Sequence, residues 1–243
     1  IGERVGGTLD NFVARMNADA QSLGMTSSRF VNPNGLPGKG QYTTARDLAV
    51  LAVALRRDFP EYAGYFSLEG INTGKKEYPN YNLLIGRFDG ADGMKTGYIC
   101  ASGFNQVSSA TRNGRTVVSV VLGADSLGAR ADLSADLLQK ALTTPRGAGP
   151  RLESLAPYGA GRDTVTDISA EVCNPQARKV RSEGRDEAGR MKLLSPYIHE
   201  MGRPPRTVFA GLIPGSEPPA KKPGSAGASE IANVPIPKPR PTF

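Results

Sequence analysis

The chain has 243 residues, of which 39% are hydrophobic and 7% aromatic, and it contains no tryptophan. These fractions are low for a fully packed chain of this length, so we expect part of it not to pack. The formal net charge of +7 belongs mainly to residues 144–243, where 15 Lys and Arg accompany 10 Asp and Glu in Pro-rich sequence. Basic residues scattered in this way, without interleaved aromatics on a folded face, favour no nucleic-acid partner.

Residue types exclude several kinds of site and segment. No charged-then-apolar leader and no run of 18 apolar residues occurs, so the sequence predicts no transmembrane segment. With His199 as the only histidine, this chain cannot form a Ser-His-Asp triad and is a poor candidate for zinc binding. Cys100 and Cys173 fit no metal or redox spacing, which leaves two alternatives: unpaired thiols, or a disulfide if the protein is exported.

Composition divides the chain near Thr143, because 15 of the 19 prolines follow that residue. We predict a folded domain over residues 1–143, a weakly structured extension over 144–214 and a disordered, Pro-rich tail over 215–243. The tail cannot bury enough apolar surface to offset the entropy lost on ordering. We interpret it as a solvated, polyproline-like spacer in preference to a ligand for an aromatic groove.

The first 143 residues alternate between helix and strand patterns. Apolar residues recur at helical spacing from Leu9 to Leu23, and Thr8 is placed to be the N-cap. A second helix is predicted after Thr44, which has capping-box spacing to Asp47, and before Pro60. A turn cluster at residues 32–35 separates the two helices.

The strongest local pattern is a β-hairpin. Strand-like runs at 104–110 and 116–122 flank Asn113-Gly114, a dipeptide typical of tight hairpin turns. The second run is almost continuously β-branched, which predicts a strand covered on both faces. A closing helix follows, and its predicted apolar side comprises Ala129, Leu133, Leu137, Leu138 and Ala141. Residues 165–172 and 207–212 are further candidates for short strands.

One short motif carries a recognisable chemistry. Lys95-Thr96-Gly97 lies just ahead of the hairpin, where a strand is expected, and Lys-Thr-Gly is one of three active-site motifs of penicillin-binding proteins and class A β-lactamases. The ammonium supplies a positive field for a substrate carboxylate, the hydroxyl can donate to that carboxylate, and the glycine admits a second backbone. The tripeptide alone would also fit a solvated lysine on an edge strand.

Further landmarks extend from residue 1 to about residue 143, and their order matches one enzyme family. They are Gly7-Thr8 with Phe12 and Met16-Asn17, Phe30-x-Asn32-Pro-x-Gly35-Leu36, Thr43-Thr44-Ala-x-Asp47-Leu48-Ala49, Asn82-x-Leu84, Gly93-Met-Lys-Thr-Gly97, Gly103-Phe-Asn105, and Gly123-Ala-Asp125 with Arg130. On these residues the chain resembles the low-molecular-mass penicillin-binding proteins that are serine-type D-alanyl-D-alanine carboxypeptidases.

The resemblance implies an α+β fold of the β-lactamase/transpeptidase type, with an antiparallel sheet flanked by helices, incomplete here, and an irregular Pro-rich C-terminal extension. It implies that the parent protein removes the terminal D-Ala of peptidoglycan stem peptides through an acyl-serine intermediate and binds β-lactams. No metal or organic cofactor is implied. The implied location is the bacterial periplasm or cell envelope.

Carried over position by position, the resemblance assigns roles to five residues. Lys95 would be the active-site lysine, and the backbone N–H of Tyr98 would be one donor of the oxyanion hole. Thr96 and Gly97 would bind substrate. Arg130 would assist with the carboxylate or, alternatively, lie on a helix surface.

Two motifs of the family have no counterpart in this chain. No serine is followed three residues later by lysine, and no Ser-x-Asn stands where the second motif belongs. The family layout places both ahead of Ile1, so we expect a fragment that is inactive alone. The remaining alternatives are a D,D-endopeptidase or β-lactamase of the same fold, or a non-catalytic fragment that binds peptidoglycan.

Overall fold

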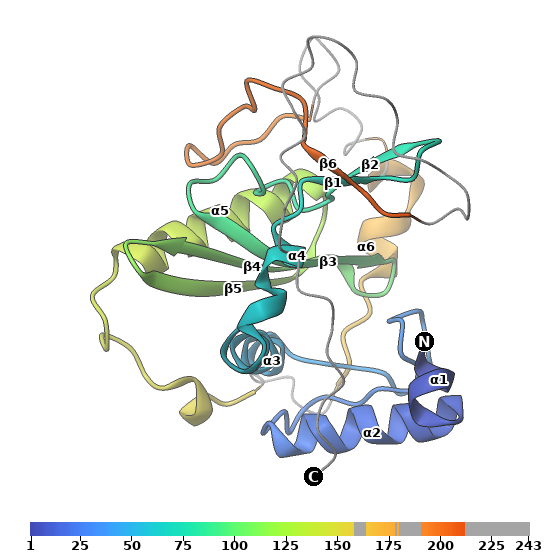
Figure 1. Ribbon diagram of the computed structural model, residues 1–243. Helices are drawn as coiled ribbons and strands as arrows, with labels where there is room; N and C mark the ends of the chain where they lie inside the picture. Colours follow the sequence, from blue (N-terminus) through green and yellow to red (C-terminus); the bar gives the residue numbers. More distant parts are fainter. Residues whose placement is uncertain (158–163, 178, 180–190, 212–243) are drawn as a thin grey trace.

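The computed structural model describes residues 1–157, 164–177, 179 and 191–211, which form an α+β fold (Figure 1). A three-stranded antiparallel sheet carries helices on both faces, as expected for this fold class. The tail predicted to be disordered, residues 215–243, lies outside the described residues. No helix in the described ranges is long and apolar enough to cross a bilayer.

The helices of the N-terminal third begin at the predicted caps. After the short helix α1 (Gly2–Gly6), helix α2 spans Leu9–Ser22, and the Thr8 hydroxyl accepts a hydrogen bond from the N–H of Asn11 at 3.2 Å. Helix α3 spans Ala45–Asp58, and the Thr44 hydroxyl accepts from the N–H of Asp47 at 3.2 Å. Both caps satisfy N–H groups that a helix start leaves without partners, so both predicted starts are confirmed.

A short 3₁₀ turn and a small helix follow α3 and lead to the sheets. The 3₁₀ turn η1 spans Pro60–Tyr62, and helix α4 spans Ala63–Phe66. The proline ends the α3 pattern because it disfavours helical backbone in the residue before it.

The predicted hairpin is confirmed and forms most of the central sheet. Strand β4 (Gly103–Arg112) and strand β5 (Arg115–Ala124) are joined by Asn113 and Gly114, whose φ angles are 51° and 69°. This pair of left-handed residues matches the twist of the flanking strands. Strand β3 (Ala91–Ile99) pairs with the other side of β4, so the order is β3-β4-β5 and β3 lies at an edge.

Helices α3 and α5 cover opposite faces of this sheet (Figure 1), which confirms that β5 is covered on both sides. Helix α5 spans Leu127–Thr143, but its predicted packing face was wrong, because Leu133 and Leu137 are 50% and 44% exposed. The residues buried along α5 are mostly small, and some of them face residues 191–193 of the extension instead of the sheet: Gly128, Ala131, Ser134 and Ala135, with Arg130 and Leu138. Small side chains let neighbouring backbone approach α5 closely, whereas Leu133 and Leu137 stay on its exposed side.

The main core lies between α5 and the sheet. Its fully or nearly buried members are Leu84, Phe88, Ala110, Ala131, Ala135 and Leu138. Burial of this apolar surface is the dominant stabilising contribution, at about 25 cal/mol per Å².

The described part of the extension includes one strand and short helical segments, among them residues 169–173 and 175–177. Strand β6 (Thr207–Phe209) pairs in parallel with β1 (Gly70–Asn72), which pairs antiparallel with β2 (Glu77–Pro79). The strand predicted at 207–212 is thus confirmed for its first three residues. The strand predicted at 165–172 was wrong: the segment contains helix α6 (Ser169–Cys173), and the Asp167 carboxylate accepts from the N–H and hydroxyl of Ser169 at 2.9 and 2.6 Å. Such a local bond competes with extended pairing.

Polar contacts fasten residues 191–211 to the domain. The Asp132 carboxylate on α5 accepts hydrogen bonds from the N–H groups of Leu194 and Ser195 at 3.0 Å. Glu69 accepts from both Nη atoms of Arg203 at 2.7 and 2.6 Å. Hydrogen bonds to carboxylates therefore order a segment whose sequence has weak hydrophobic periodicity. The 3₁₀ turn η2 (Leu152–Ser154) precedes this region.

Candidate active site

The Lys-Thr-Gly motif lies in the middle of the edge strand β3, where Lys95 pairs with Val107 and Thr96 with Gln106. Alternation along the strand places Lys95 and Gly97 on the face toward α3 and α4, and Thr96 on the face toward α5. The Lys95 ammonium is exposed and donates to the Thr96 carbonyl. A Cβ atom at Gly97 would meet no other atom within 4 Å, so the space above this glycine is open.

A carboxylate at the start of β3 anchors the strand to α3. Asp92 accepts from Arg56 through both guanidinium nitrogens, at 3.0 and 2.8 Å, and from the hydroxyls of Ser109 and Thr111 at 2.6 Å. A bidentate pair of this kind restrains orientation as well as distance. Asp92 therefore fixes where the motif begins.

A buried amide network supports the same strand from the α5 side. Asn82 donates to the Gly93 carbonyl at 2.8 Å, and Gln106 donates to Asn82 at 3.1 Å and to Ser108 at 2.7 Å. Asn82 and Gln106 are 2% and 1% exposed. Asn82 was one of the landmarks in the sequence and Asp92 was not, and the positioning role of both residues was missed. Their only local signal is proximity to the motif in the chain.

Arg130 is a buried cation that reaches from α5 to the motif strand. It is 2% exposed, which excludes the alternative of a helix-surface arginine. Its guanidinium donates to the carbonyl of Gly97 at 3.4 Å and to that of Tyr81 at 3.0 Å, and lies 5.9 Å from the ring centroid of Phe104. Burial lowers the pKa of Arg130 from its ordinary value. Among the described residues its hydrogen-bond acceptors are neutral carbonyls.

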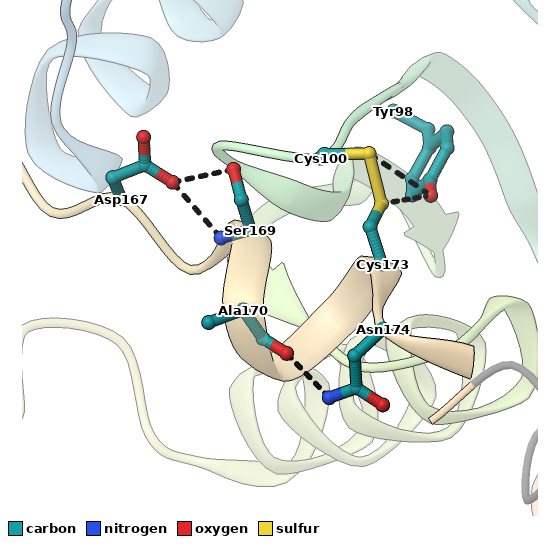
Figure 2. Close-up of a disulfide and its surroundings, with 7 residues drawn as sticks. All are labelled: Tyr98, Cys100, Asp167, Ser169, Ala170, Cys173 and Asn174. Atoms are coloured by element: carbon teal, nitrogen blue, oxygen red, sulfur yellow. Dashed lines mark hydrogen bonds between the residues drawn. A yellow bond between two sulfur atoms is a disulfide. The ribbon is translucent and has the colours of Figure 1, made fainter. Parts of the chain in front are cut away.

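Tyr98 lies where β3 ends. Its side chain is 45% exposed, its ring centroid is 4.2 Å from that of Phe104, and its hydroxyl lies 3.0 Å from Sγ of Cys173 (Figure 2). Cys100 and Cys173 form a disulfide with an S–S distance of 2.04 Å. Of the two alternatives left open by the sequence, the structure therefore contains the disulfide, and it joins the turn after β3 to α6 (Figure 2).

The five predicted site residues thus divide between the two faces of one strand. Thr96, Tyr98 and Arg130 lie toward α5, and Lys95 and Gly97 lie toward α3. Two surface hollows of about 420 Å³ each lie elsewhere, one beside α5 at Asp136 and Tyr197 and one between residues 85–91 and His199. Neither is lined by the motif. The described residues form one open wall of a site, and no group of three or more potential metal ligands occurs among them.

Comparison with known proteins establishes the family. Residues 1–126, just over half of the chain, match the family model of D-alanyl-D-alanine carboxypeptidase. This chain therefore belongs to the D-alanyl-D-alanine carboxypeptidase family, whose members are serine peptidases.

Individual relatives agree with this assignment. The chain is 36% identical over 141 residues to the D-alanyl-D-alanine carboxypeptidase DacA of Haemophilus influenzae and 37% identical over 139 residues to DacC of Escherichia coli. Each match covers 57% of this chain, but only 36% and 35% of those proteins. The chain thus spans about a third of the length of these curated relatives.

Solved structures give the same fold. The D-alanyl-D-alanine carboxypeptidase DacD of Francisella tularensis matches with a TM-score of 0.56 and 34% identity over 58% of this chain and 47% of its own. Penicillin-binding protein D2 of Listeria monocytogenes, solved in a cefotaxime-bound form, matches with a TM-score of 0.52 and 32% identity over 57% of each chain.

Proposed function

We propose that the whole protein is a serine-type D-alanyl-D-alanine carboxypeptidase that removes the terminal D-Ala of peptidoglycan stem peptides and is acylated by β-lactams. The observation that carries this proposal is the placement of Lys95-Thr96-Gly97 on the edge strand β3 of a chain that belongs to this family. An edge strand presents backbone groups that can pair with an extended peptide.

Each site residue has a role in this proposal. The Lys95 ammonium supplies the positive field beside the reacting serine, which a Ser-x-x-Lys motif elsewhere in the protein provides. The Thr96 hydroxyl binds the terminal carboxylate of the substrate, and bare Gly97 lets its backbone approach. The backbone N–H of Tyr98 donates to the oxyanion that develops on the scissile carbonyl.

Arg130 strengthens the case for an anionic substrate. A buried charge is stable when it is paired, and the described partners of this guanidinium are neutral carbonyls. Its positive field therefore remains available on the Thr96 side of β3, where the substrate carboxylate would lie. Since the Gly97 carbonyl accepts from Arg130, the same side chain also restrains the motif backbone.

The chemistry then follows in two steps. The serine oxygen attacks the scissile carbonyl, a C–O ester bond forms and the C–N bond breaks. The proton of the serine hydroxyl passes to the amine of the terminal D-Ala, which leaves. Water attacks the ester, which releases the shortened stem and restores the serine hydroxyl.

The disulfide supports a location in the periplasm or cell envelope, because disulfides persist in oxidising compartments. We retain residues 1–143 as the catalytic-domain portion and 144–214 as an appended extension.

Covalent labelling tests the proposal. The full-length protein should retain a fluorescent penicillin through denaturation, and a variant that lacks the Ser-x-x-Lys serine should not. The present chain alone should remain unlabelled, because it contains no Ser-x-x-Lys. Absence of label on the full-length protein, together with no release of D-Ala from a pentapeptide, would overturn the proposal. Faster cleavage of a cross-linked peptide or of penicillin would favour the endopeptidase or the β-lactamase.

A further inference from the structure

Helix α6 belongs to the extension, yet it is fastened to the end of the motif strand. The Cys100–Cys173 disulfide joins residues 73 positions apart, and the N–H of Ile168 donates to the Ala101 carbonyl at 3.0 Å. Val172 is 1% exposed, so α6 adds a buried apolar side chain to the covalent link. Covalent, polar and apolar contacts therefore all hold α6 at this place.

Two glycines leave room for the side chain of Ile168, the residue just before α6. A Cβ atom at Gly103 would lie 2.7 Å from Cδ1 of Ile168, and one at Gly123 would lie 3.6 Å from the same atom. A side chain at Gly103 would displace Ile168, and it would also lie 2.8 Å from the Ala124 carbonyl oxygen, so the bare glycine serves both the pairing of the hairpin and the entry to α6. The position of α6 beside β3 is thus specified by the sequence of both partners.

The proposed function, on which this inference rests, fixes the direction of a bound peptide. Its terminal carboxylate lies at Thr96 and its scissile carbonyl at the N–H of Tyr98, so the peptide runs antiparallel to β3. Residues upstream of the scissile bond then continue past Tyr98 toward Cys100. At about 3.3 Å per residue in an extended chain, the second upstream residue reaches the level of the disulfide.

We propose that α6 and the Cys100–Cys173 disulfide, together with the half-exposed ring of Tyr98, form the subsite for the stem-peptide residues upstream of the scissile bond. The ring and the two sulfur atoms make an apolar, polarisable surface, with the Tyr98 hydroxyl against Cys173 Sγ (Figure 2). This surface fits the aliphatic part of a peptide side chain. The extension thereby makes the enzyme selective for long stem peptides over short acylated D-Ala-D-Ala.

A ratio of two rates tests this subsite. In the full-length protein, kcat/KM is measured for a pentapeptide stem and for an N-acetylated D-Ala-D-Ala dipeptide, which ends before Cys100. Cys100→Ser and Cys173→Ser should each lower the pentapeptide-to-dipeptide ratio about tenfold, mainly through a higher KM for the pentapeptide. Ile168→Ala keeps the disulfide but removes the side chain that packs on Gly103 and Gly123. It should therefore lower the ratio by a smaller factor.

Arg203→Ala is the matched control, because it removes the ion pair between the extension and Glu69 and leaves α6 in place. Its ratio should equal that of the wild type. Equal losses on both substrates in the cysteine variants would show that the tether only stabilises β3, and would overturn the subsite. An unchanged ratio would overturn it as well. A wild-type protein that cleaves neither substrate and takes no penicillin label would instead remove the proposed function itself.

Discussion

Replacement of Lys95 separates a catalytic lysine from a surface lysine most sharply. The side chain is exposed, and its ammonium donates a hydrogen bond to the carbonyl of its own neighbour, Thr96. Lys95→Ala in the full-length protein should therefore change the free energy of unfolding by no more than about 0.5 kcal/mol. The same change should strongly slow acylation by penicillin and release of D-Ala.

The expected loss of rate follows from the interaction that is removed. A charge-assisted contact to a carboxylate contributes on the order of 1.5–3 kcal/mol, which corresponds to roughly ten- to a hundredfold in rate. The loss is larger if proton transfer also depends on the ammonium. Lys95→Arg should not restore full activity, because a planar guanidinium does not replace a compact ammonium.

The assay compares acylation rate and melting temperature for each variant. Lys140→Ala is the control, because Lys140 is also exposed but lies in the last turn of α5, beyond the reach of the motif. It should leave the acylation rate unchanged. Wild-type rates in Lys95→Ala, or a rate loss matched by a large fall in melting temperature, would remove Lys95 from the catalytic site.

Three further predictions concern stability. Asp92→Ala should lower the free energy of unfolding by about 2–3 kcal/mol, because it leaves a half-buried arginine of α3 without its carboxylate. In the same denaturant titration, Asp89→Ala, which breaks an exposed pair, should lower it by less than about 1 kcal/mol. Arg203 lowers the pKa of Glu69 from 4.5 to about 2, so the stabilisation is complete above pH 4.5 and is lost as the pH falls toward 2; Glu69→Gln should flatten that part of the curve of melting temperature against pH. Reduction of the disulfide should lower the unfolding free energy by roughly 2–4 kcal/mol, measured with and without dithiothreitol; no change would show that the loop it closes is already restrained.

Local signals in the sequence were sufficient for the elements that carry the motif. Thr8 and Thr44 specify helix starts because a cap bonds only to residues within one turn. Asn113 and Gly114 specify the hairpin because the required left-handed backbone is a property of the two turn residues themselves. The Lys-Thr-Gly motif could also be placed on a strand, because it lies directly before the hairpin in the sequence and can pair with the first hairpin strand.

The tertiary structure decided the features that depend on residues far apart in the chain. The periodicity of α5 could not identify its buried face, because Leu137 and Leu138 point in different directions and only packing against the sheet selects one. Arg130 is buried because β3 and Phe104 cover it. Both lie far from Arg130 in the sequence, so the residues around Arg130 could not predict its burial. The pairing of Cys100 with Cys173 depends on where α6 docks, and that position is set by the glycine turn beside β3. The sequence by itself thus determined the family, the main elements and the strand that carries the motif, whereas long-range packing decided which side chains surround it.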